Sequence, residues 1–175
     1  CTVEDADYLA SGVFKKLDEA LPGKCNLACF WNEKTFSLEG IEEFEIAPIL
    51  KQYKEPVRSD KCILVVAKSI ISGACVVATN INNLISDLKP TKIYVLAPVM
   101  LAGSENRLQG HFPSSLVRKF SYLRFAVDRG RDERGWVDPG VGGSVYEKYG
   151  FGNEQEKNLI VPEIVRVRRE KMLAH

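Results

Sequence analysis

The sequence predicts an α/β domain with a mainly parallel sheet flanked by helices. Three short apolar segments lie at residues 62–67, 93–99 and 123–127, and segments with a helical pattern separate them. The first segment is wholly apolar and rich in β-branched side chains, as expected for a central strand covered on both faces. Strands and helices that alternate in this way imply right-handed crossover connections and helices on both faces of the sheet.

The elements before this sheet are expected to be a helix, a strand and a hairpin. Residues 8–21 form an amphipathic pattern, because apolar residues recur at every fourth position from Leu9 with charged residues between them. A Pro-Gly pair at 22–23 would end this helix, and a strand is expected at 26–31. Residues 33–60 are largely polar and contain two prolines, which predicts a projecting hairpin or flap.

The elements after the central strand follow from the same patterns. Ser72 and Gly73 are expected to open a helix that runs to about Leu88. A strand at 93–99, a helical segment at 114–120 and a strand at 123–127 come next. A last helix is predicted from about Pro162, with four apolar candidates for docking it onto the domain: Ile164, Val165, Val167 and Met172.

The length and net charge of the chain indicate how many domains it has and which kinds of partner it does not attract. A chain of 175 residues suits one domain. Its 24 Lys and Arg against 23 Asp and Glu give a net charge of +1, which excludes a global attraction to nucleic acid or to an anionic membrane. No apolar run reaches the roughly 18 residues of a membrane helix, so we expect a water-soluble protein.

The cysteines and histidines predict neither a disulfide framework nor a metal site. Five cysteines, an odd number, indicate a reducing intracellular compartment: Cys1, Cys25, Cys29, Cys62 and Cys75. This would be the cytoplasm, or a plastid or the mitochondrial matrix if Cys1 follows a removed targeting peptide. Cys25 and Cys29 have no second pair nearby, and His111 and His175 are distant in sequence, so no zinc site is expected.

A phosphate site is predicted at the turn that follows the first buried strand. In open α/β sheets, ligands bind beyond the carboxyl ends of the strands. The N-terminus of the next helix offers unpaired N–H groups and a partial positive charge. The candidate residues are Ser72, Gly73, Ala74 and Cys75. The structural alternative is that the Ser-Gly pair only caps the helix.

A glycine-dense loop at residues 135–143 is the second candidate site. Four glycines and Pro139 give it a backbone that could fold tightly over a small planar ligand, whose edge the N–H and C=O groups would bind. The alternative is a glycine-rich turn that merely covers the edge of the sheet.

Residues 126–143 also carry a family resemblance. They read A-V-D-R-G-R-D-E-R-G-W-V-D-P-G-V-G-G and resemble the uracil-binding loop of uracil phosphoribosyltransferases, written A-I-D-x-G-L-N-x-x-G-Y-I-V-P-G-L-G-D. The positions in register are Asp128, Gly130, Gly135, Pro139, Gly140 and Gly142. Residues 26–36 and 63–75 are similar, in the same order, to the family's G-I-Y-R-D-E-x-T-L and L-L-x-D-P-M-L-A-T-G-G-S segments.

The resemblance implies a type I phosphoribosyltransferase-like fold with the glycine-rich loop as a hood over a base. The hood residues would be Asp128, Gly135, Trp136, Val137, Pro139, Gly140 and Gly142. Residues 1–152 would form the family-like domain, without the N-terminal part of the family fold. Residues 153–175 would be a C-terminal helical extension that the family normally lacks.

Departures from the family pattern concern the groups that catalyse transfer. The acid that holds the ribose hydroxyls aligns with Ala67, T-G-G-S becomes residues 72–75, and R-A-G aligns with residues 8–10. The acid that ends the loop is replaced by Gly143. By analogy with oxyanion-type sites, each lost charge would reduce the rate by about 10²–10³-fold.

Three functions therefore stay open. The first is a catalytically degenerate phosphoribosyltransferase-like protein that acts as a structural or interaction subunit of a larger assembly or homo-oligomer. The second is an active uracil or other base phosphoribosyltransferase in pyrimidine salvage, which would use Mg²⁺ to make a nucleoside monophosphate. The third is a sensor that binds a base or nucleotide without turnover. The catalytic residues stay unassigned, and no nucleic-acid partner is expected.

Overall fold

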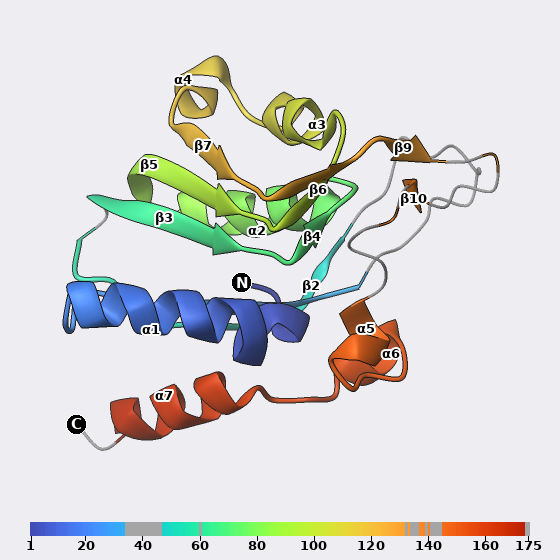
Figure 1. The fold of residues 1–175 in the computed structure, drawn as a ribbon. Coiled ribbons are helices and arrows are strands. Elements are labelled where there is room, and N and C mark those ends of the chain that lie inside the picture. Colours follow the sequence, from blue (N-terminus) through green and yellow to red (C-terminus); the bar gives the residue numbers. More distant parts are fainter. Residues whose placement is uncertain are drawn as a thin grey trace.

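The computed structural model describes residues 1–33, 47–59, 61–131, 133, 137–138, 140 and 145–173 (Figure 1). Its centre is a parallel sheet in the order β3-β5-β7, made of β3 (Lys61–Ala67), β5 (Lys89–Leu96) and β7 (Phe120–Leu123). Each strand breaks and resumes, which gives a second parallel sheet in the order β4-β6-β8, made of β4 (Ile70–Ile71), β6 (Val99–Leu101) and β8 (Ala126–Asp128). The α/β class with a mainly parallel sheet is confirmed.

The break between the two sheets lies at the same level in all three strands. Hydrogen bonds from Lys68 N to Leu96 O (3.0 Å) and from Ala97 N to Leu123 O (2.9 Å) carry the strand pairing up to it. Pro98, directly after it, has no N–H to donate. Its carbonyl accepts from both Phe125 N and Ala126 N. Backbone hydrogen bonds therefore continue between the strands across the break.

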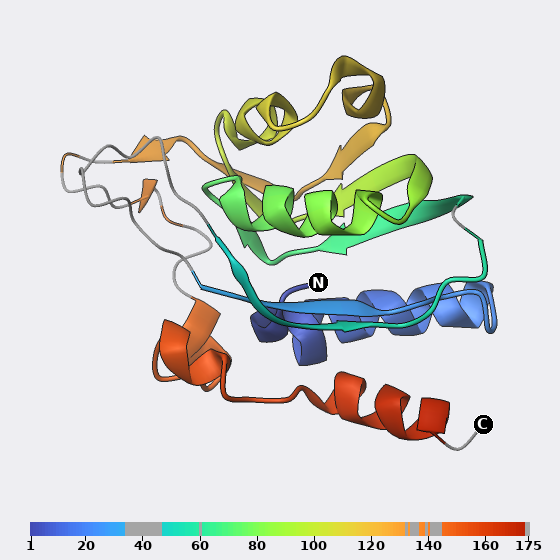
Figure 2. The same ribbon diagram turned by 180° about the vertical axis from the view of Figure 1, so that it is seen from behind.

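One face of the sheet is covered by α2 (Cys75–Ile85), α3 (Ser104–Gly110) and α4 (Ser114–Val117). Figure 2 shows α2 in front of the strands. Apolar residues at helical spacing in α2 pack on alternate residues of β5, which builds the larger core. This core contains Ile71, Val77, Ala78, Ile81, Ile93, Val95, Met100, Leu108 and Phe112. These elements give an α/β arrangement in which helices cover one face of a parallel sheet.

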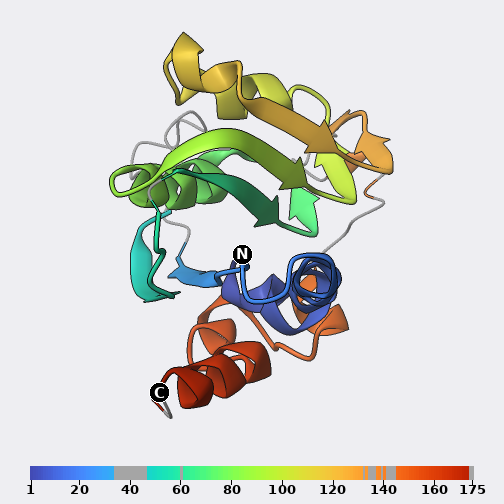
Figure 3. The same cartoon turned by 90° about the vertical axis from the view of Figure 1, so that its left-hand side faces the viewer.

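A second layer is made by the two ends of the chain and a hairpin. Two short irregular turns, Val3–Asp5 and Ala6–Ala10, lead into α1 (Ser11–Ala20), so the predicted first helix is confirmed. The strand predicted at 26–31 is confirmed as β1 (Ala28–Asn32). It pairs antiparallel with β2 (Ile49–Lys54), which belongs to the segment predicted as a projecting hairpin or flap, and residues 34–46 of that segment lie outside the described residues. Helices α1 and α7 (Glu163–Leu173) stack beneath the sheet, on the side away from α3 and α4 (Figures 1 and 3).

The C-terminal segment packs closely on this second layer. It forms α6 (Glu154–Lys157) and α7, preceded by α5 (Val145–Lys148). Val165 of α7 joins a smaller core with Val3, Ala6, Leu27, Cys29 and Trp31. Asp7 caps α7 from the other end of the chain, because its carboxylate accepts from Glu163 N (2.7 Å) and Ile164 N (2.8 Å).

The structure corrects the predicted place of the 62–67 strand. β3 lies at the edge of the parallel sheet and β5 at its centre, since within the described residues β3 pairs with β5 alone. Ile63 is accordingly 61% exposed. An apolar run predicts that a strand is buried, but it does not tell a central strand from an edge strand whose second face lies against other elements.

Boundaries also differ in the middle of the chain. β5 begins at Lys89, four residues before the predicted start, and the ladder accommodates Pro90 opposite Cys62 next to an irregularity in register. Helix α3 was not predicted, because seven residues are too few to show a helical period. In the described part of the chain, no helix is long and apolar enough to cross a membrane.

Candidate functional site

The predicted phosphate turn lies where an α/β fold places ligands. Ser72, Gly73 and Ala74 connect β4 to α2, and Cys75 is the first residue of α2. Ala74 occupies the N-cap position and offers no side-chain hydrogen bond to the helix. Arg107 of α3 donates from Nη2 to the carbonyl of Ser72 (3.0 Å), which brings a guanidinium to this turn. The turn thus combines a helix N-terminus with a neighbouring cation.

The predicted hood is described only in part. Asp128 ends β8 and is buried, and its carbonyl accepts from Ala102 N (2.8 Å). β9 (Gly130–Arg131) pairs antiparallel with β10 (Val137–Asp138), so the chain turns back on itself here, and Gly140 has a positive φ of 68°. Four further hood candidates lie outside the described residues: Gly135, Trp136, Pro139 and Gly142. Base binding by the hood stays a prediction.

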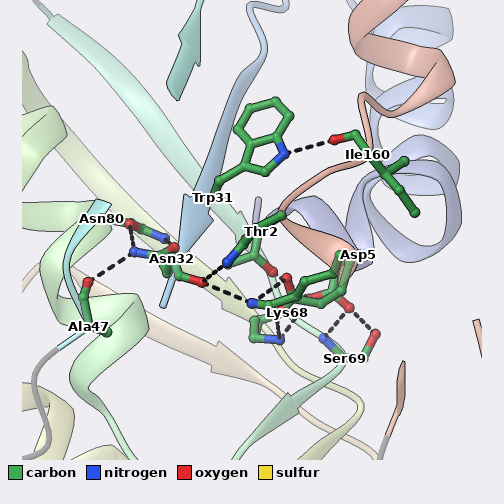
Figure 4. Close-up of polar contacts among 12 residues, drawn as sticks. Thr2, Asp5, Trp31, Asn32, Ala47, Lys68, Ser69, Asn80 and Ile160 are labelled. Atoms are coloured by element: carbon green, nitrogen blue, oxygen red, sulfur yellow. Dashed lines mark hydrogen bonds and ion pairs between the residues drawn. The ribbon is translucent and has the colours of Figure 1, made fainter. Parts of the chain in front are cut away.

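A buried ionic network occupies the end of β3, and sequence reasoning missed it. The ammonium group of Lys68 lies 3.0 Å from a carboxylate oxygen of Glu4 and 2.9 Å from one of Asp5. Lys157 of α6 approaches the other oxygen of Glu4 at 3.5 Å. Both acids are buried, and Thr2 adds a hydroxyl hydrogen bond to Asp5 (3.0 Å). Figure 4 shows Lys68 close to Asp5, with Ser69 on the other side of the carboxylate.

The network favours the charged forms of Glu4 and Lys68. Burial alone would raise the pKa of Glu4, but the positive charges of Lys68 and Lys157 outweigh it and lower the pKa to about 2. Burial alone would lower the pKa of Lys68, yet Glu4 and Asp5 raise it above its ordinary value. Two carboxylates thus face two ammonium groups, and the charges of the network balance.

An asparagine pair ties the network to the rest of the molecule. Asn32 at the end of β1 and Asn80 of α2 exchange two amide hydrogen bonds of 2.9 Å. The backbone carbonyl of Asn32 accepts from Lys157 Nζ (3.1 Å). Nearby, Trp31 donates from Nε1 to the carbonyl of Ile160 (2.8 Å; Figure 4). The sheet, the hairpin and the C-terminal segment therefore meet at this one junction.

Ser69 links the network to α5 and its following turn. Its backbone N–H donates to Asp5 Oδ1 (3.1 Å), and its hydroxyl also hydrogen-bonds to that carboxylate. The Ser69 and Tyr149 hydroxyl groups lie 2.8 Å apart. The Tyr149 ring stacks on Tyr8, with 4.0 Å between centroids, and the Tyr8 hydroxyl donates to the Tyr149 carbonyl (2.9 Å). These contacts hold the end of the glycine-rich segment against the N-terminal turns.

An open pocket of about 400 Å³ lies beside Ser69. Its walls are mostly apolar, and three of the lining residues offer polar groups: the Ser69 and Tyr149 hydroxyls and the ammonium group of Lys148. The other lining residues are Leu9, Ile70, Pro98, Val99 and Val145. Its volume falls within the range of small-molecule sites. None of the four predicted phosphate-turn residues lines it, so the pocket and that turn are neighbours and not one site.

Two signals in the sequence pointed to this junction. Lys68 is a charged residue directly after the apolar run that ends at Ala67, and Ser69 separates it from the apolar Ile70. Three acids lie within residues 4–7. Neither signal identifies its partner, because the pairs are separated by more than 60 residues. As for metals, the described residues contain no group of three or more His, Cys, Asp or Glu side chains that could hold an ion.

Comparisons with known proteins give little beyond this geometry. No protein-family model matches the chain, and no curated protein matches it. Among solved structures, the chain is similar to the AQ2163 protein from Aquifex aeolicus, at 13% sequence identity and a TM-score of 0.46. The match covers 67% of this chain and 55% of that one, so the chain spans about half the length of that protein.

Proposed function

We propose that this chain is a phosphoribosyltransferase-like protein, resembling uracil phosphoribosyltransferase, that lacks transferase activity and serves as a structural or interaction subunit. The observation that carries the proposal lies at the end of β3. Ala67 occupies the position at which the resemblance places the acid that holds ribose. The next side chain, Lys68, is bound by Glu4 and Asp5 of the same chain.

The chemistry of transfer explains why this arrangement argues against turnover. Phosphoribosyl transfer creates a cationic sugar and an anionic leaving group, and catalysis needs charged groups or a metal directed at both. In the network, each carboxylate already faces an ammonium group. Withdrawing one member to hold a substrate would leave a buried charge unpaired, at a cost of about 3–5 kcal/mol.

A radiolabelled-uracil assay with phosphoribosyl pyrophosphate and Mg²⁺ tests the proposal. We expect no uridine monophosphate above background from the full chain. Turnover within about tenfold of the usual enzyme median near 10 s⁻¹ would overturn the proposal in favour of an active phosphoribosyltransferase. The Lys68→Met variant should be equally inactive, which separates an absent site from one that Lys68 merely blocks.

The pocket beside Ser69 favours a second candidate, a sensor that binds a base or nucleotide without turnover. Its apolar walls suit a planar ring, and Lys148 suits an anionic group. Calorimetry with uracil, uridine monophosphate and phosphoribosyl pyrophosphate tests this function. Saturable binding that Lys148→Met weakens and Lys16→Met does not would support it and place the anion at the pocket, since Lys16 is an exposed lysine of α1.

The same titrations test the predicted phosphate turn. If the phosphate binds at the N–H groups of residues 72–75, Gly73→Val should abolish binding, because the added side chain would block the close approach of the phosphate. Binding that Gly73→Val leaves unchanged would show that the turn is only the connection between β4 and α2.

A further inference from the structure

The parallel sheet has one face that no described helix covers over β5 and β7. Successive residues of a strand point to opposite faces. The alternate residues that pack in the larger core include Val66, Val95 and Tyr122, so their neighbours lie on the other face. These neighbours are in register across the three strands. Among them are Lys92, which pairs with Ile63, and Ser121, which pairs with Tyr94. We call the apolar ones the open face: Ile63, Val65, Tyr94, Leu96 and Leu123. Figure 1 shows β5 and β7 in front of α2 with no described helix before them.

The open face is apolar and accessible. Ile63 is 61% exposed and Leu123 is 53% exposed. Two residues further along, in the break between β7 and β8, Phe125 is 94% exposed. Parallel sheets normally have both faces covered, and exposed large apolar residues that gather in one area mark interaction sites. This surface therefore has the composition of a covered one, and the described elements leave it accessible.

The charges around the open face are mainly positive. Lys61 is exposed at the amino end of β3, and Lys92 lies with its ammonium group 6.0 Å from the centre of the Tyr94 ring. At the other end, Arg124 forms an ion pair with Glu105 of α3. A second copy of the chain would bring like charges together, whereas a partner with acidic residues would complement them.

We propose that the open face binds an amphipathic helix of a partner protein, with an apolar stripe that packs on Ile63, Leu123 and Phe125 and with acidic residues beside that stripe. A helix is the element that covers a parallel sheet in α/β proteins. Apolar residues at i, i+3, i+4 and i+7 would contact the sheet. This inference rests on the proposed function of an interaction subunit and names the surface that performs it.

Two synthetic helical peptides with the same leucine stripe test the proposal, one with glutamates beside the stripe and one with lysines. Fluorescence anisotropy with the full chain should show the acidic peptide binding at least about tenfold more tightly, and less so at high salt. Leu123→Asp and Phe125→Asp should each weaken binding by about tenfold or more. Leu159→Asp, at a 79% exposed leucine between α6 and α7, should leave it unchanged.

The other outcomes overturn the proposal. Equal affinities for the two peptides would do so, as would a loss with Leu159→Asp that matches the loss with Leu123→Asp. Sedimentation velocity that shows a dimer, which Phe125→Asp converts to monomers, would assign the open face to a second copy instead. Because Phe125 is almost fully exposed, Phe125→Asp should fold even if Leu123→Asp does not.

The peptide and transferase experiments fail independently. A chain without turnover that ignores both peptides would overturn this inference alone. A chain that binds the acidic peptide and also makes uridine monophosphate would overturn the proposed function alone.

Discussion

The carboxyl edge of the sheet and its open face differ in whether their side chains have partners within the described chain. At the edge, where an α/β protein usually carries its chemistry, Glu4 and Asp5 neutralise Lys68 within the chain. On the open face, Ile63 and Leu123 keep more than half of their surface accessible. The charged groups at the carboxyl edge are thus paired within the chain, while the apolar side chains of the open face remain accessible.

This difference shows why a fold can persist while its site changes. Two distant parts of the chain, residues 2–7 and 153–175, contribute the contacts that join the edge to the second layer. Such contacts stabilise the junction whether or not a ligand binds there. Fold alone therefore does not define function, and the edge and the open face have to be tested separately.

The largest expected effect is that of Lys68→Met. Removing this ammonium group takes away the cation that pairs with Asp5 and leaves Glu4 paired with Lys157 alone, which should cost about 3–5 kcal/mol of unfolding free energy. Urea denaturation measures it. Lys16→Met removes an exposed pair with Glu19 and should cost no more than about 0.5 kcal/mol. Similar losses in the two variants would contradict the view that the edge is a buried network.

Acid should weaken the same junction. The pKa of Glu4 falls from its ordinary value of 4.5 to about 2 on folding. The stability that this shift provides is therefore present above pH 4.5 and is lost as the pH falls through about 2. The shift corresponds to about 3 kcal/mol, since one pKa unit is worth about 1.4 kcal/mol.

Glu4→Gln should flatten this part of the stability profile, measured by urea denaturation between pH 5 and 2. Glu163→Gln is the matched control, because Glu163 is exposed. A profile that Glu4→Gln leaves unchanged would place the acid dependence on other carboxylates.

The sequence predicted the elements better than the junction. Alternating apolar and helical segments are local patterns, so the helix at 75–85, the strand at 28–32 and the parallel pairing of the later strands could all be expected. Lys68 could be identified as the residue after a strand, but its partners are more than 60 residues away in the sequence. Local patterns carry no information about such pairs, and the edge position of β3 escaped prediction for the same reason.

Val165→Ala tests how firmly the C-terminal segment belongs to the second layer. Val165 is 3% exposed within the smaller core, so losing two methyl groups should cost about 2 kcal/mol of unfolding free energy. Val161→Ala, at a 59% exposed valine of the same segment, should change it little. If Val165→Ala were equally silent, residues 153–175 would be a surface attachment and not part of the fold.

The smallest expected effect is that of Tyr149→Phe, which separates the pocket from the network beside it. The variant removes the hydroxyl that lies 2.8 Å from Ser69 Oγ but keeps the ring that stacks on Tyr8. Ser69 retains its hydrogen bonds to Asp5, so the loss should be about 1 kcal/mol in urea denaturation. Tyr94→Phe on the open face is the control and should change stability by less. A loss for Tyr149→Phe as large as that for Lys68→Met would mean that the tyrosine belongs to the buried network, and that the pocket is part of the structural junction instead of a place for a ligand.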